Sequence, residues 1–161
     1  MFDLLAMGRP EGPGCYCYVN VLLRKIVDTI SKNYPLVVID AEAGLEHLSR
    51  RTTRDVDVML VATDPTMRSM ETARRILQLT KELQTNVGRI YAVANRVPDA
   101  LRATVVQSIE NLGLHCIAVV PEDPAIQEWD IAGKPLVTLP DISPSYRAIS
   151  DMIGKISLET S

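Results

Sequence analysis

The sequence lacks several features, and each absence excludes a class of protein. It has no run of 18 apolar residues, so it predicts no membrane-spanning helix. Three cysteines do not make a disulfide framework, which is typical of a protein in the reducing cytoplasm. The segment 1–5 carries no basic residue, so we expect no signal peptide. The net charge of −3 argues against a dedicated nucleic-acid binder.

What is present is an alternation of strand-like and helix-like segments. The 161 residues are 47% hydrophobic, which is enough for one domain, residues 1–161, with a proper core. Helices are indicated by apolar residues at spacings of three and four, and their expected starts or ends are marked by Ser69, Gly113, Asp123 and Ser143. Strands are predicted at 2–7, 36–40, 56–63, 88–94 and 115–120. This order predicts an α/β fold, a three-layer sandwich with a mainly parallel sheet.

The stretch 36–44 organises this prediction. Leu36-Val37-Val38-Ile39 has the composition of a strand buried on both faces, and Asp40 follows it directly. Ligands of parallel sheets bind at the carboxyl ends of strands. In P-loop NTPases an Asp in this position holds magnesium, and the glycine loop after it senses the terminal phosphate. A core strand whose Asp caps the next helix is the equally weighted alternative.

Two segments resemble a known family. They are Gly-Arg-Pro-Glu-Gly-Pro-Gly-Cys-Tyr-Cys at 8–17 and Ile-Asp-Ala-Glu-Ala-Gly-Leu-Glu-His-Leu-Ser-Arg-Arg-Thr-Thr at 39–53. Both are similar to the nickel-insertion accessory ATPases of carbon monoxide dehydrogenase, which belong with the ParA/MinD-type ATPases and resemble the nitrogenase iron protein. The resemblance runs along almost the whole chain. It implies a P-loop NTPase-like fold, a cytoplasmic homodimer, and the nickel–iron carbon monoxide dehydrogenase as client.

The resemblance also assigns individual residues. It implies that Asp40 is the magnesium-side aspartate and that 41–44, with Glu42 and Gly44, is the phosphate-sensing switch. Asn95 matches the residue that reads the base, and Pro121, Glu122 and Asp123 match the loop that closes over adenine. From the residues alone, Asn95 is more often part of a turn and Asp123 more often a helix start.

The phosphate loop of the family is missing from this sequence. No G-x-x-x-x-G-K-[ST] occurs among the eight glycines, and segment 8–14 contains no lysine. The sequence begins where the second core strand of the family would begin, so we expect the fold without its first strand, from a truncated reading frame or a short relative. The family's cofactors are ATP and magnesium, but we expect this chain to bind ATP weakly or not at all. We also expect 36–40 and 56–63 to pair directly, or another chain to fill the slot between them.

Cys15 and Cys17 are the candidate metal ligands. They follow a stiff Gly/Pro loop, and two thiolates leave a tetrahedral soft-metal site half complete. A second copy of the chain across a twofold axis supplies two more thiolates. This arrangement predicts a homodimer that binds about one zinc or nickel ion per two chains. The alternative is that the cysteines only begin a helix. His47 stands where the iron protein has its second cluster cysteine, so we expect no iron–sulfur cluster.

Two functions remain open. The first is a nickel-insertion accessory protein, or its C-terminal part, favoured by the Cys-x-Cys pair. The second is a ParA/MinD-like interaction or dimerisation module without ATP or metal chemistry, favoured by the missing phosphate loop. The basic residues Arg50, Arg51 and Arg54 fit either a solvated face or a grip on an acidic partner.

Overall fold

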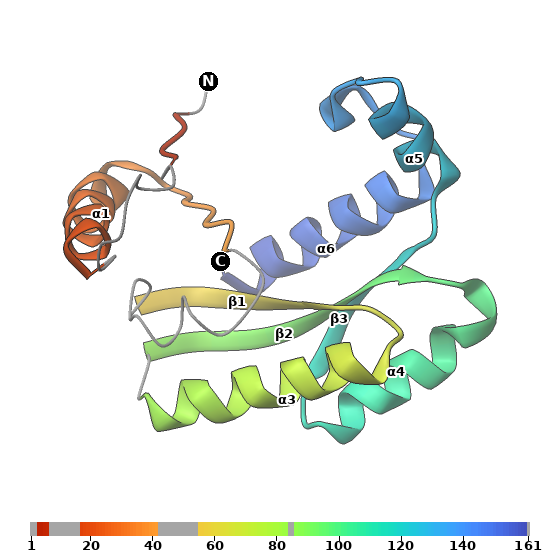
Figure 1. Ribbon diagram of the computed structural model, residues 1–161, viewed down its shortest axis with the longest axis horizontal. Helices are drawn as coiled ribbons and strands as arrows, with labels where there is room; N and C mark the ends of the chain where they lie inside the picture. The colour runs from red at the N-terminus through yellow and green to blue at the C-terminus, as the bar shows by residue number, and fades with distance from the viewer. Residues whose placement is uncertain (1–2, 7–16, 42–54, 84–85, 161) are drawn as a thin grey trace.

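The computed structural model of the chain describes residues 3–6, 17–41, 55–83 and 86–160 (Figure 1). Eleven elements follow one another within these ranges. In chain order they are α1 (Cys17–Ile30), η1 (Ser31–Asn33), β1 (Asp55–Thr63), α3 (Met67–Glu82), β2 (Asn86–Val97), η2 (Asp99–Leu101), α4 (Arg102–Asn111), β3 (His115–Pro121), α5 (Pro124–Ile131), η3 (Leu136–Thr138) and α6 (Pro144–Thr160).

Three parallel strands form the sheet, in the order β1-β2-β3. β1 and β2 pair in one register from Asp55↔Asn86 to Thr63↔Ala94. Parallel neighbours need a crossover, and the helices α3 and α4 supply the two crossovers here. The strands predicted at 56–63, 88–94 and 115–120 are therefore confirmed, and β2 is longer than predicted at both ends.

The helices cover the sheet from two sides (Figure 1). α3 and α4 pack on one face, around a core cluster that includes Val61, Ala73 and Ile109. α6 packs on the other face, where Met152 joins Tyr91, Val93 and Ile117. The three layers and the parallel sheet confirm the predicted fold class.

The prediction of two further strands, at 2–7 and 36–40, is wrong for the described residues. Residues 3–6 and 35–41 form no part of the sheet, and the apolar side chains of 36–39 are exposed, with Leu36 at 75% and Val38 at 83%. Burial of such a strand requires neighbours along its edges and layers on its faces. Direct pairing of this segment with β1 is likewise wrong, since the only partner of β1 among the described residues is β2. Whether a second chain fills the slot stays a prediction.

α1 lies apart from the sheet in Figure 1 and contacts mainly η1, which follows it directly. The helix confirms the periodicity of three and four in this segment, yet no described side chain between residues 21 and 41 is buried. In the ranges that the structure describes, no helix is both long and apolar enough to cross a membrane.

The helix boundaries test the predicted caps. Asp123 caps α5 as predicted, and its carboxylate accepts a hydrogen bond from the Ala125 N–H. Gly113 follows α4 with a φ of 80°, a conformation that glycine adopts without steric cost. Ser69 as the start of α3 is wrong. The N-cap is Thr66, whose extended backbone lets its hydroxyl accept from the Ser69 N–H at 3.2 Å.

Candidate functional site

The parallel sheet gathers three strand ends at one place, which we call the carboxyl edge. It consists of Thr63 at the end of β1 with Asp64 after it, Asn95–Val97 at the end of β2, and Pro121 at the end of β3 with Glu122 and Asp123 after it. Because all three strands run in the same direction, these segments lie side by side. In open α/β sheets this is the position where ligands bind.

Asp64 forms the first corner of the carboxyl edge. Its Oδ1 accepts from the N–H and the hydroxyl of Thr66 at 2.9 and 2.6 Å, and its own N–H donates to Ser69 Oγ at 2.9 Å. Hydrogen bonds from Thr66, helped by the charge of Arg96, hold the pKa of the Asp64 carboxyl below its ordinary value. Asp64 is therefore an anchored carboxylate at neutral pH.

Asn95 and Arg96 form the second corner, at an irregularity of β2. Ala94 pairs with Val119 and Val97 with Pro121, so β2 carries one residue more than β3 over this interval. Such a bulge changes the direction of the side chains next to it. Asn95 and Arg96 are both exposed, although the flanking Ala94 and Val97 are fully buried.

Asp123 forms the third corner, and its carboxylate is occupied by hydrogen bonds within the protein. Oδ1 accepts from Ala125 N–H at 3.0 Å, and Oδ2 accepts from Ser143 Oγ at 2.5 Å and from Ser145 N–H at 3.3 Å. The hydrogen bond from Ser143 is the main cause that lowers the pKa of Asp123. Ser145 Oγ donates to the Pro121 carbonyl, so the loop is tied to the start of α6. Asp123 holds the loop in place, whereas its neighbour Glu122 is exposed.

The structure brings together only some of the residues predicted for the site. Asn95, Pro121 and Asp123 share the carboxyl edge, whereas Asp40 is exposed in the segment outside the sheet. Cys17 is the first residue of α1, with its side chain outside the described part. The remaining predicted positions lie entirely outside the described residues: Cys15, Glu42, Gly44, His47, Arg50, Arg51 and Arg54.

Sequence reasoning missed Asp64, Thr66 and Arg96. Asp64 follows a β-branched strand just as Asp40 does, so the same signal was available for both. Arg96 had no comparable signal, because its contact with Asp64 joins residues 32 positions apart.

The described residues contain no group of three or more His, Cys, Asp or Glu side chains that could hold a metal ion. The third cysteine, Cys116, lies in β3 against the core formed with α3 and α4. Burial raises the pKa of its thiol, which disfavours the thiolate that a soft metal binds.

No protein-family model matches the sequence. An uncharacterized ATP-binding protein of Methanocaldococcus jannaschii is 48% identical over 155 residues, 96% of this chain and 61% of that protein. The carbon monoxide dehydrogenase accessory protein CooC of Rhodospirillum rubrum is 32% identical over 148 residues, 89% of this chain and 54% of CooC. The chain thus spans little more than half the length of these curated relatives.

Solved structures agree on the fold. A ParA family ATPase from Chlorobium tepidum matches with a TM-score of 0.69 at 22% identity, over 82% of this chain and 55% of that one. The septum site-determining protein MinD from Pyrococcus horikoshii, complexed with Mg-ADP, matches with a TM-score of 0.64 at 18% identity, over 85% and 56%. Zinc or nickel has no support from these comparisons. The homologues are ATP-binding proteins of the ParA/MinD family, and the chain has the fold of their P-loop NTPases.

Proposed function

We propose that this chain acts in nickel insertion into carbon monoxide dehydrogenase, as an accessory protein or as the C-terminal part of one. In this proposal the carboxyl edge faces the adenine end of a nucleotide, and the pair Cys15 and Cys17 binds the metal across a homodimer. The observation that carries the proposal is the identity of 32% to the accessory protein CooC over 89% of the chain.

The carboxyl edge supports the nucleotide part of the proposal. Asn95 offers an exposed amide, with donor and acceptor side by side, which matches the N6 and N7 edge of adenine. Asp123 keeps the neighbouring loop fixed through three hydrogen bonds, so the loop can form a wall beside the base without reorganising.

The spacing of the cysteines supports the metal part. Cys15 and Cys17 stand one residue apart, directly after the Gly/Pro segment 8–14. Two chains together offer four cysteine sulfurs, the number that a closed tetrahedral site requires. The metal is the cargo of the proposed reaction.

Metal analysis of the purified full chain tests this proposal. We expect about one zinc or nickel ion per two chains, and a dimer by light scattering. The variant Cys15→Ser/Cys17→Ser should lose the metal and weaken the dimer, whereas the control Cys116→Ala should retain both. An unchanged metal content in the double variant would contradict the proposal.

ATP binding by this chain is expected to be weak or absent. Backbone amides and a lysine supply most of the grip on the phosphates in P-loop proteins, and segment 8–14 contains no lysine. Without a phosphate loop, Asn95 and the loop that begins at Pro121 hold only the base end of ATP. Calorimetry that finds tight, magnesium-dependent ATP binding would overturn this expectation.

The second candidate is a ParA/MinD-like interaction module without ATP or metal chemistry. The absence of a G-x-x-x-x-G-K-[ST] motif from the 161 residues favours it. The second function is favoured over the first if the full chain dimerises without metal and the double cysteine variant leaves the dimer unchanged.

A further inference from the structure

Two buried serines hold the loop at the end of β3 from a distant part of the chain. Ser143 and Ser145, where α6 begins, are only 3% and 4% exposed. Ser143 Oγ donates to Asp123 Oδ2 at 2.5 Å, and Ser145 Oγ donates to the Pro121 carbonyl at 3.2 Å. Because a buried hydroxyl without a partner is costly, both hydroxyls favour this one position of the loop. The loop Pro121–Asp123 is therefore held at its first and its last residue.

Ser143 also joins the starts of two helices. Its Oγ accepts from the Tyr146 N–H of α6 at 3.2 Å, while it donates to the carboxylate of Asp123. The same carboxylate accepts from the Ala125 N–H and caps α5. In Figure 1, α6 begins beside α5, beyond the end of β3. A displacement of the loop therefore disturbs the first turns of α5 and α6 together.

The surface of the loop that remains for a ligand is small. Glu122, the middle residue, is exposed, whereas the flanking Pro121 and Asp123 are only partly exposed and bonded to α6. A ligand that meets a loop already held in one position does not have to supply the free energy of ordering it. The affinity of the carboxyl edge for a ligand that touches this loop thus depends on the two serines behind it.

We propose that Ser143 and Ser145 are positioning residues, which keep the loop Pro121–Asp123 in its binding conformation and couple ligand binding to the start of α6. This inference rests on the proposed function, because it requires a base to lie against the loop. Neither serine contacts the ligand. A ligand that binds only the held loop makes its opening rarer. Since the hydrogen bonds of the serines break when the loop opens, the first turn of α6 is stabilised as well.

NMR titration of the isotope-labelled full chain with adenosine at pH 7 tests the proposal. The nucleoside probes the base end without the phosphates. Ser143→Ala and Ser145→Ala each remove one tie between α6 and the loop. The control is Thr138→Ala in η3, outside the loop. Its hydroxyl also makes two hydrogen bonds, accepting from Trp129 Nε1 at 3.0 Å and donating to the Pro135 carbonyl at 2.7 Å.

We expect the affinity for adenosine to fall about fivefold in Ser143→Ala and less in Ser145→Ala, and to stay unchanged in Thr138→Ala. Ser143→Thr, which keeps the hydroxyl, should retain part of the affinity. Urea unfolding establishes that each variant is folded under the conditions of the titration. A purely structural role of the serines predicts instead a lower stability with an unchanged affinity, and this result would overturn the proposal.

Hydrogen exchange of the same samples tests the coupling to α6. The amides of 145–147 bond to Asp123 and Ser143, so their exchange reports on the start of this helix. In the wild type, adenosine should slow exchange at 122–123 and at 145–147. In Ser143→Ala the effect at 145–147 should be lost. An equal effect of adenosine on 145–147 in this variant would contradict the coupling.

The outcomes separate this inference from the proposed function. If adenosine shifts the signals of the carboxyl edge and both serine variants bind it like the wild type, the positioning role is wrong and the proposed function stands. If millimolar adenosine shifts no signal at the carboxyl edge of the wild type, this inference is wrong together with the nucleotide part of the proposed function. The second candidate, without ATP chemistry, is then favoured.

Discussion

Two regions of this chain have similar apolar sequences and opposite surroundings. Leu36-Val37-Val38-Ile39 lies outside the sheet with its side chains exposed, whereas Tyr91-Ala92-Val93-Ala94 in β2 is buried between two layers of helices. Figure 1 shows the difference as a compact unit from β1 to α6 and a separate arm made of α1 and the segment after it.

An apolar run predicts the character of a strand but not its neighbours. β2 is buried because β1 and β3 pair with both of its edges, and because each face meets a helix. The segment 36–39 has neither kind of partner among the described residues. Stability is therefore expected to reside almost wholly in the unit from β1 to α6.

Truncation of a core side chain in this unit should cost the most stability. Ile109 of α4 is fully buried against the sheet, so Ile109→Ala should lower the free energy of unfolding by about 3 kcal/mol. The matched change Leu36→Ala in the arm should cost about 0.5 kcal/mol or less. Urea unfolding of both variants measures the contrast. Equal losses would mean that the arm is packed in solution.

The second effect concerns the link between β3 and α6. Asp123→Ala removes the cap of α5 and leaves the buried Ser143 hydroxyl without its acceptor, which should cost about 2 kcal/mol. Urea unfolding at pH 7 measures this loss. Asp123→Asn, which keeps an acceptor oxygen, should retain part of the stability, and a loss as large as that of the alanine variant would argue against the hydrogen-bonding account.

The stability that Asp123 contributes depends on pH in a definite direction. The pKa of Asp123 is lowered in the folded state, so its contribution is complete above the unfolded pKa of about 4 and is lost as the pH falls through the folded value. The difference between wild type and Asp123→Ala should therefore shrink below about pH 4. A difference that grows on acidification would contradict the assignment.

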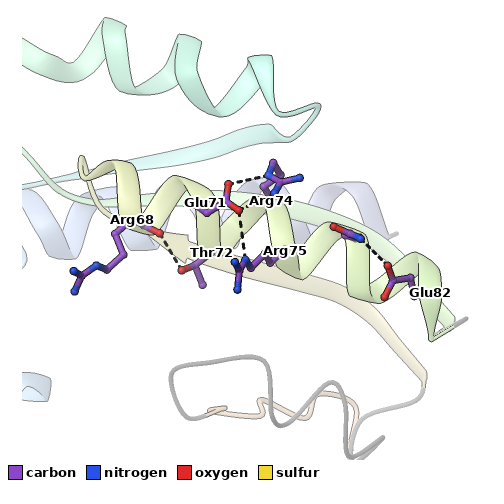
Figure 2. Close-up of polar contacts among 7 residues, drawn as sticks. Arg68, Glu71, Thr72, Arg74, Arg75 and Glu82 are labelled. Carbon is purple, nitrogen blue, oxygen red and sulfur yellow. Dashed lines mark hydrogen bonds and ion pairs between the residues drawn. The ribbon is translucent and has the colours of Figure 1, made fainter.

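The smallest effect is expected on the outer face of α3. Figure 2 shows Glu71 between Arg74 and Arg75, and the hydrogen bond from Arg74 lowers the pKa of Glu71 to about 2. Because these groups are exposed, Glu71→Gln should leave the unfolding midpoint almost unchanged at pH 7. Any contribution should disappear between about pH 4 and pH 2, and NMR titration of the Glu71 carboxyl measures its pKa directly.

The sequence was sufficient for the elements whose signals are local. The strands at 56–63 and 115–120, the Asp123 cap and Gly113 depend on residues close together in the chain. The sheet order and the fate of 36–40 depend on which partners the chain supplies, and an apolar pattern does not contain that information. In the site, Asn95 was predicted through a resemblance and stays a prediction, whereas the pair of Asp64 and Arg96 exists only once β1 and β2 lie side by side.

Hydrogen–deuterium exchange of the full chain, with and without millimolar ATP and magnesium, tests the proposal that the carboxyl edge is the nucleotide-facing part of this protein. Without ligand, the β2 amides should exchange slowly and those of 36–41 rapidly. With ligand, we predict slower exchange at 95–97 and at 122–123, the ends of β2 and β3. Slower exchange confined to other parts of the chain would contradict the account.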